Sequence, residues 1–238
     1  MGFGTNSLEK AVKSMLDHGS RVQAPAIAKY VRHLREEHPD ESPAEIVERI
    51  EKMYLLAVIG SGGAVGAAAA FPGIGTLTSL AAAGAETAFF LEASAVYTLA
   101  VAAVHGVAPE DNEHRKALVL AVALGDSGMD VVQKAVGSQA KNWGTLMANR
   151  IPGVAQMNDS LLKRFLVRFA TRRLMLLTGK ILPAGIGAAI GAFGNRALGK
   201  GVVANAHKAF GPAPATWPQA PLIIDPAPEK PAITPPKV

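Results

Sequence analysis

The sequence predicts an all-α protein, and three observations support this class. Proline, glycine and capping residues delimit several segments in which apolar residues recur at helical spacing. No segment shows the alternation of apolar and polar residues that is typical of a half-buried strand. Alanine dominates the apolar residues, which make up 49% of the chain, whereas aromatic residues make up only 5%. This composition favours many close helix contacts over a core built on a few large side chains.

Three helices can be delimited by their ends. The first runs from Pro25 to about Glu37 and is ended by His38-Pro39-Asp40. The second opens at Ser42-Pro43-Ala44-Glu45, a capping box with proline at the first helical position, and runs to about Leu56 or beyond. The third has the acidic residues Glu110, Asp111 and Glu113 at its start, where the helix dipole favours them, and Gly125 at its end.

The central run from Met53 to Gly106 predicts a helical hairpin. Its only clearly charged side chains are Glu86 and Glu92, and the segment Phe71-Pro72-Gly73-Ile74-Gly75 divides it. Proline disfavours helix in the residue before it, and the glycines permit a tight reversal of the chain. We therefore expect a helical bundle built around a glycine- and alanine-rich apolar hairpin.

Small residues recur every four positions in two places, as in a glycine zipper. The first stripe is Gly62, Gly66 and Ala70, and the second is Gly187, Gly191, Asn195 and Gly199. Residues four apart lie on one side of a helix, so these stripes predict close helix packing. A phosphate-binding loop is not expected, because a dinucleotide fingerprint needs a preceding strand and a P-loop needs Gly-Lys-Ser/Thr.

The hairpin is a marginal candidate for crossing a membrane by itself. Its first arm consists mostly of small residues of modest hydrophobicity. Its second arm carries Glu86 near the middle, which costs about 2 to 3 kcal/mol on insertion. We expect a hairpin that is buried in protein and able to lie against or enter a membrane.

The segment from Asn158 to Gly179 predicts a basic amphipathic helix. Arg164, Arg168 and Arg172 are four residues apart, Arg173 adds to them, and an apolar face lies beside them. Such a helix binds anionic lipid or an acidic partner. A plainly solvated helix is an equal alternative. Nucleic acid is not expected, because no known motif appears and few aromatic residues are interleaved.

Glu86, Glu92 and His105 are the candidate catalytic residues, because burying carboxylates is costly and perturbed groups gather at functional sites. Glu86 and Glu92 cannot form a close dyad, since six residues of helix separate them by about 9 Å and 240°. No metal site is expected, because the other histidines show no ligand spacing. No cofactor is expected, and the absence of cysteine excludes disulfides and thiolate chemistry.

The domain organisation is simple. We expect one helical domain over residues 1–210 and a disordered proline-rich tail over 211–238, because proline denies both helix and central strand. The N-terminus shows no secretory signal. We expect a cytoplasmic protein that is peripherally or partly associated with membrane.

Six segments, in their order along the chain, resemble the EcsC family in its actinobacterial form. They are FPGIGT, ETAFFLEASAVYTLAVAAVHG, HRKALVLAVALGDSG, RIPGVAQMN, ILPAGIGAAIGAFGNRALG and AFGPAPATWP. The resemblance covers the chain from about Ile50 to Pro218. It implies a helical protein associated with the membrane or a transport system, without an established activity, and it assigns no catalytic residue.

Two functions from different classes follow as hypotheses. The first is a non-enzymatic, membrane-associated protein that packs or inserts its hairpin and binds anionic lipid or a transporter partner through its basic helix. The alternative is a hydrolase or metal-dependent enzyme that uses buried Glu86, Glu92 and His105 in a cavity between helices. Assembly into a homo-oligomer is left open.

Overall fold

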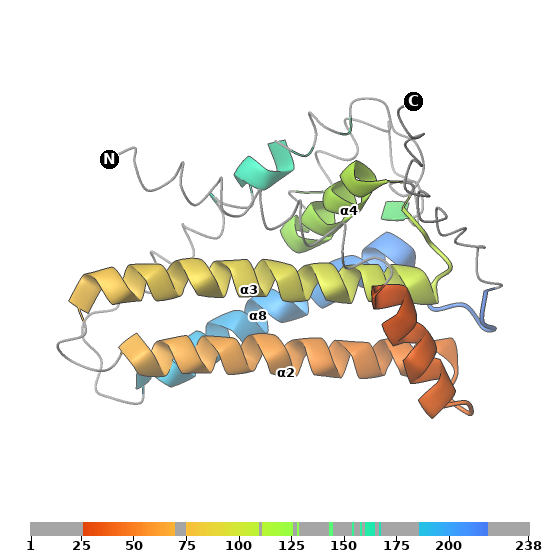
Figure 1. Ribbon diagram of the computed structural model, residues 1–238, viewed down its shortest axis with the longest axis horizontal. Helices are drawn as coiled ribbons and strands as arrows, with labels where there is room; N and C mark the ends of the chain where they lie inside the picture. The colour runs from red at the N-terminus through yellow and green to blue at the C-terminus, as the bar shows by residue number, and fades with distance from the viewer. Residues whose placement is uncertain are drawn as a thin grey trace, which may run out of the picture.

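The computed structural model describes the long helices and their immediate surroundings. The described residues are 26–69, 75–109, 111–125, 128, 143–144, 154, 158, 160–164, 167 and 186–218. They form helices and irregular segments without a strand, which confirms the all-α class. Residues 26–37 form a helix, close to the bounds expected for the first one (Figure 1).

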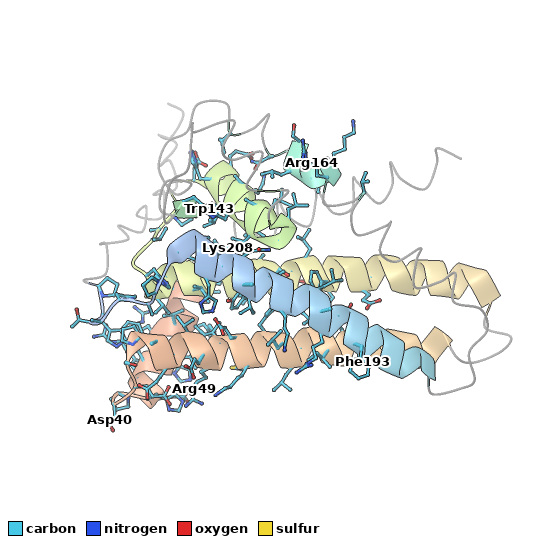
Figure 2. The ribbon with its side chains drawn as sticks, turned by 180° about the vertical axis from the view of Figure 1, so that it is seen from behind. Asp40, Arg49, Trp143, Arg164, Phe193 and Lys208 are labelled. Carbon is cyan, nitrogen blue, oxygen red and sulfur yellow. The ribbon has the colours of Figure 1, made fainter. Side chains whose placement is uncertain are left out.

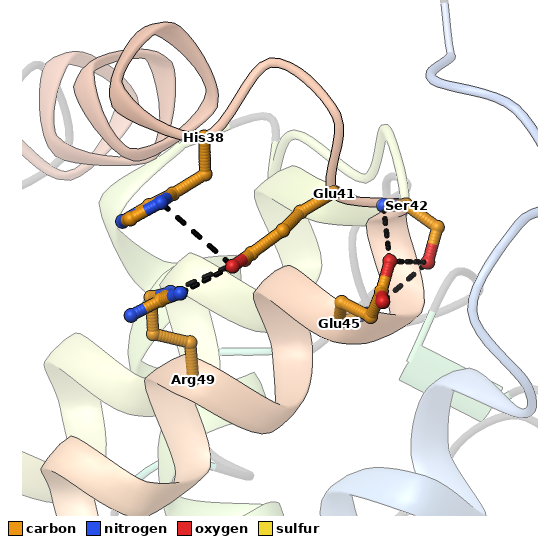
Figure 3. Close-up of polar contacts among 5 residues, drawn as sticks. All are labelled: His38, Glu41, Ser42, Glu45 and Arg49. Carbon is orange, nitrogen blue, oxygen red and sulfur yellow. Dashed lines mark hydrogen bonds and ion pairs between the residues drawn. The ribbon is translucent and has the colours of Figure 1, made fainter.

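The start of helix α2 (Pro43–Ala69) confirms the predicted capping box (Figure 3). The backbone N–H of Ser42 donates to the Glu45 carboxylate at 2.7 Å, and the backbone N–H of Glu45 donates to the Ser42 hydroxyl at 3.4 Å. The hydrogen bonds from the Ser42 backbone and side chain lower the pKa of the Glu45 carboxyl. Arg49 donates to Glu41 at 3.2 Å and thereby attaches the residue before the cap to α2.

Helix α2 continues for 27 residues through the glycine-rich stretch. The helix expected from Ser42 and the first arm expected from Met53 are therefore one helix. Helix α3 (Gly75–Val104) lies alongside α2 and runs in the opposite direction (Figure 1). The connection at 70–74, which contains the predicted break, is outside the described residues.

Helix α8 (Ile186–Phe210) packs along α2, also in the opposite direction (Figures 1 and 2). Two contacts establish this direction. His207, near the end of α8, meets Glu51 in the first half of α2. Asn195, nearer the start of α8, donates to the Val58 carbonyl further along α2. The α2–α8 contact thus joins segments that are far apart in the sequence.

Gly199 allows α2 and α8 to approach closely. A Cβ atom at this position would lie 2.9 Å from the Val58 side chain, closer than real Cβ atoms come, and 3.0 Å from the Leu55 side chain of α2, which is a tight contact. Gly62 of α2 is also buried. The other predicted packing glycines belong to α2 or α8, but their surroundings are outside the described residues; they are Gly66, Gly187 and Gly191.

Helix α4 (Asn112–Leu124) confirms both predicted ends. The carboxylate of Asp111, the N-cap, accepts a hydrogen bond from the His114 backbone N–H at 3.0 Å. Gly125 follows the last turn with a φ of +63°, a conformation that favours glycine. Asn205 of α8 donates to a carbonyl in the last turn of α4 at 3.0 Å. This hydrogen bond attaches α4 to α8.

Two stacked tyrosines lie between α2 and α3. The ring centroids of Tyr54 and Tyr97 are 4.7 Å apart, and the Tyr54 hydroxyl is hydrogen-bonded to Ser94 at 2.9 Å. Burial is the main cause that raises the pKa of both phenols well above the usual value of 10. Both tyrosines are therefore neutral hydrogen-bonding groups near neutral pH.

Residues 211–218 follow α8 without regular structure and lie against the helices. Gly211 has a φ of +76° and donates to a carbonyl in the last turn of α8 at 2.9 Å, an ending typical of helices. Trp217 packs against the hydrophobic core, and the Arg35 guanidinium lies 4.9 Å from the centre of its ring. The rest of the predicted tail, 219–238, is outside the described residues.

Candidate functional site

Glu86 lies in the interior between three helices. It is 3% exposed, and its carboxylate accepts a hydrogen bond from the Asn195 amide of α8 at 2.9 Å. The same amide donates to the Val58 carbonyl of α2 at 2.9 Å and lies 3.5 Å from the Ser61 hydroxyl. Glu86 therefore joins α3, its own helix, to α8 and through Asn195 to α2. This arrangement gives the carboxylate a structural role in aligning the helices.

The structure does not bring the three candidate catalytic residues together. Glu86 is buried as expected, whereas Glu92, which was also expected to be buried, is exposed, so that part of the expectation is wrong. His105 follows the end of α3, nineteen positions after Glu86, which corresponds to about 28 Å of helix rise. A single active site cannot contain Glu86 and His105 in this arrangement.

His105 instead lines a pocket with other polar residues. The pocket has a volume of about 160 Å³ and lies where the first half of α2 meets the ends of α3 and α8. Its polar residues are Glu48 and Glu51 of α2, Tyr97 and His105 at the end of α3, and His207 of α8. Valine, alanine and proline side chains form the other walls.

Glu51 is the centre of the polar contacts in this pocket. Its carboxylate accepts hydrogen bonds from His207 Nε2 at 2.5 Å and from the Tyr97 hydroxyl at 3.4 Å. Burial first, and then the nearby Glu51 charge, raise the pKa of Tyr97, so its hydroxyl remains a donor. One carboxylate thus links α2 to both α3 and α8.

The imidazole of His105 is held in one orientation. Its Nδ1 lies 2.8 Å from the Val101 carbonyl, so Nδ1 carries the hydrogen and donates it. The ring packs against Phe210 with centroids 5.4 Å apart, and Nε2 is buried without a hydrogen-bond partner among the described residues. No three histidines or carboxylates within the described ranges are arranged to hold a metal ion.

The α2–α8 pair also presents an outer surface with exposed apolar and basic side chains. Val58 and Asn195 meet in the contact, and the next residues, Ile59 and Arg196, lie beside it. Because the two helices run in opposite directions, the residue that follows the contact residue lies on the same side of the helix pair in both helices. We call this side the α2–α8 outer face; it comprises Lys52, Leu56, Ile59, Phe193, Arg196 and Lys200.

The α2–α8 outer face is both apolar and positively charged. Leu56 and Phe193 are 71% and 69% exposed, which is unusual for large apolar side chains. Arg196 and Lys200 are exposed and form no ion pair with any described residue. Lys52 is also exposed, and Glu48 is the nearest acid on the same side of α2, one turn earlier. This surface therefore combines two features that are common at binding surfaces.

The predicted basic helix is described only at its start. Lys163 and Arg164 are exposed, whereas Leu161 and Leu162 are buried, so this part has the expected two-sided character. Figure 2 places Arg164 beyond α4, on the other side of α3 from α2. The remaining predicted contacts lie outside the described residues; they are Arg168, Arg172 and Arg173.

Sequence reasoning missed most of the pocket and the α2–α8 outer face. Glu51 and His207 are separated by 156 positions, and no motif links them. A weak signal existed in Arg196 and Lys200, four residues apart and next to the second small-residue stripe. Arg196 and Lys200 lie beside the exposed Leu56 only because α8 packs against α2, and the sequence does not show which helix packs against that stripe.

Comparison with known proteins adds no relative to these observations. The EcsC resemblance therefore depends on the quoted segments alone. No protein-family model, no curated protein and no solved structure matches this chain.

Proposed function

We propose that the protein is a non-enzymatic helical protein that binds anionic membrane surfaces through the α2–α8 outer face. In this proposal α2 and α3 form a hairpin that closes at 70–74, and α8 packs along it through small residues to complete a bundle. The observation that carries the proposal is the pairing of exposed Leu56 and Phe193 with Arg196 and Lys200, which have no acidic partner in the described part of the chain.

The chemistry of this surface suits the boundary between lipid headgroups and acyl chains. Basic side chains contribute about 1 kcal/mol each near an anionic membrane surface. Apolar side chains such as Leu56 and Phe193 gain free energy when they leave water for the acyl region. The described helices include none that is long and apolar enough to cross a bilayer, and the proposal requires only surface attachment. The resemblance to the EcsC family agrees with a membrane-associated role.

Two basic regions compete for this role. Arg164 lies on the other side of α3 from α2, so Arg164 and the α2–α8 outer face do not face the same plane (Figure 2). The α2–α8 outer face is favoured because its basic residues stand next to exposed large apolar ones. The experiment should therefore test the two regions separately.

Vesicle flotation tests the proposal. The full-length protein is mixed with phosphatidylcholine vesicles that contain or lack phosphatidylglycerol. We expect binding only with phosphatidylglycerol, and weaker binding as the salt concentration rises. In the double variant Arg196→Glu/Lys200→Glu, the affinity should fall at least about thirtyfold, since two favourable charges are lost and two unfavourable ones gained.

A charge-matched variant provides the control. Lys29 and Arg32 are exposed on the helix at 26–37, which lies in front of α2 in Figure 1, whereas α8 lies behind it. The double variant Lys29→Glu/Arg32→Glu should bind vesicles as the original protein does. Equal losses in both double variants would indicate an effect of net charge alone. Loss of binding in Arg164→Glu, with none in Arg196→Glu/Lys200→Glu, would assign the membrane contact to the other basic region.

A further inference from the structure

We propose that the pocket between α2, α3 and α8 binds a small aliphatic ammonium ion. The inference goes beyond membrane binding and does not depend on it. It rests on three properties of the pocket: an excess of hydrogen-bond acceptors, apolar walls, and a volume that suits a small molecule.

The unused polar atoms of the pocket are hydrogen-bond acceptors, and besides His105 Nε2 they belong to carboxylates. Glu48 makes no hydrogen bond or ion pair with a described residue, and only one oxygen of Glu51 is engaged, by His207 and Tyr97. These two acids are three residues apart on α2, so they lie on one side of the helix. Neither lysine nor arginine lines the pocket, and His207 is engaged with Glu51. Lys52, one turn after Glu48 on α2, is exposed and lies outside the lining.

The charge of the pocket therefore selects a cation. Its lining holds two carboxylates, of Glu48 and Glu51, and no lysine or arginine, and the only contact to them from a basic side chain of the lining is that of His207 with Glu51. The Tyr97 hydroxyl already donates to Glu51, so the pocket offers a ligand acceptors rather than donors. An ammonium group has three donors and one positive charge, which matches the free oxygens of Glu48 and Glu51.

The walls and the volume of the pocket indicate which group the ammonium ion should carry. Val47 of α2, Val101 of α3 and Ala213 after α8 form an apolar lining that suits a short hydrocarbon chain. An apolar cavity of about 150 Å³ in another protein takes up benzene, so a pocket of about 160 Å³ has room for about six non-hydrogen atoms.

The pocket is formed before any ligand arrives. Gly211 turns the chain at the end of α8, and Pro212 and Ala213 form one wall. The contact between Trp217 and Arg35 holds the following residues against the helix at 26–37. A site that is already built requires little ordering when a ligand binds, which favours affinity for small ligands.

Titration of n-butylammonium chloride into the full-length protein tests this inference. Binding is followed by the NMR chemical shifts of the His207 side chain and the Ala206 backbone amide. We expect saturable shifts with a dissociation constant on the order of 1 mM. From ethylammonium to butylammonium, each added methylene group should increase the affinity about fourfold, until the apolar walls are covered. n-Butanol has nearly the same shape without the charge and should bind at least about tenfold more weakly.

Three variants localise the binding. Glu48→Gln removes a carboxylate that has no hydrogen bond or ion pair with a described residue, and Glu51→Gln removes the one at the centre of the pocket. Each should weaken butylammonium binding at least about tenfold. Ala213→Phe should abolish binding by filling the space. Glu92→Gln, a change of the same kind on an exposed site of α3, should leave the affinity unchanged.

The inference is overturned by any of three results. One is the absence of saturable shifts at concentrations about fiftyfold above the expected dissociation constant. Another is equal binding of butylammonium and n-butanol. The last is unchanged binding in both Glu48→Gln and Ala213→Phe, provided that circular dichroism shows these variants to be folded. Because none of these measurements uses lipid, their failure leaves the proposed membrane function intact, and the reverse is also true.

Discussion

The α2–α8 pair has two unlike sides, an inner contact and an outer face, made by residues that are immediate neighbours in the sequence. Asn195 is buried and bonds to Glu86 and the Val58 carbonyl, whereas Arg196 is exposed. Gly199 has no room for a methyl group, whereas Lys200 extends into solvent. The inner contact is therefore sensitive to the loss of a hydrogen bond or the gain of one atom, and the outer face is available for binding.

The largest expected effect comes from Asn195 in the inner contact. The change Asn195→Leu removes the amide that donates to the buried Glu86 carboxylate and to the Val58 carbonyl. Loss of a partner inside the protein leaves the full cost of desolvating these groups, so the free energy of unfolding should fall by about 2 to 4 kcal/mol. Urea denaturation followed by circular dichroism measures this change.

A double variant shows whether the buried charge of Glu86 causes the loss of stability in Asn195→Leu. Replacing both groups, as in Glu86→Leu/Asn195→Leu, removes the carboxylate together with its donor. Apolar pairs of similar size are often nearly neutral substitutes for buried polar pairs, so part of the lost stability should return. If the double variant is less stable than Asn195→Leu alone, packing rather than the Glu86 charge accounts for the effect.

Substituting alanine at Gly199 or Gly201 compares the inner contact with the exposed surface of the same helix, because each change adds one methyl group to α8. A Cβ at Gly199 would lie 2.9 Å from Val58, whereas a Cβ at Gly201 would meet nothing within 4 Å. Gly199→Ala should destabilise the protein by about 1 to 2 kcal/mol, because overpacking outweighs the gain in helix propensity. Gly201→Ala should stabilise it by about 0.5 to 1 kcal/mol through propensity alone.

Thermal or urea unfolding of the two alanine variants measures the difference. The control is internal, since both variants add the same atoms to α8. Equal changes in the free energy of unfolding of the two variants, in the same direction, would contradict the close α2–α8 contact at Gly199. Stabilisation by Gly199→Ala would show that α2 and α8 are further apart than the structure indicates.

The sequence allowed prediction of those features that depend on neighbouring residues. The capping box at Ser42 and the ends of α4 at Asp111 and Gly125 follow from hydrogen bonds within one turn of helix. The pairing of α8 with α2 could not be predicted, because it depends on contacts across more than a hundred positions, such as the 137 that separate Val58 from Asn195. Spacing shows that a small-residue stripe exists, but not which helix it meets.

The candidate sites also contain features that could be predicted from the sequence and features that could not. A buried position for Glu86 could be expected from its apolar surroundings in the sequence, and the structure shows 3% exposure. The pocket could not be expected, because Glu51, Tyr97 and His207 come from three helices and each is ordinary in its own segment. The exposure of Leu56 could not be predicted either, because an apolar residue in an apolar run is normally assigned to the core.

A smaller effect is expected from the cap of α2, an exposed polar contact that contrasts with the buried one at Asn195. Hydrogen bonds from Ser42 lower the pKa of Glu45 below its usual 4.5. Because the pKa of this carboxyl is lower in the folded than in the unfolded chain, the ionised form stabilises the fold above pH 4.5. This contribution is lost as the pH falls through the folded-state pKa.

The variant Glu45→Gln tests the pH dependence. Its stability at neutral pH should be slightly lower than that of the original protein, and its stability should fall less steeply below pH 4.5. Urea midpoints measured across the acidic range give both curves. Glu36→Gln, an exposed change on the helix at 26–37 without a described hydrogen bond, is the control and should follow the original curve. Identical curves for all three proteins would show that the cap contributes no pH dependence.

The smallest effect on stability is expected on the outer face itself. Leu56 and Phe193 are 71% and 69% exposed, so their replacement by serine removes little buried apolar area. The double variant Leu56→Ser/Phe193→Ser should change the free energy of unfolding by less than about 0.5 kcal/mol, apart from the weaker helix propensity of serine. The same variant should lose most of its binding to phosphatidylglycerol vesicles, because the side chains that enter the acyl region are gone. A loss of stability as large as that of Gly199→Ala would mean that these residues are covered in solution, for example by a second copy of the chain, and would remove the contrast between the two sides of the pair.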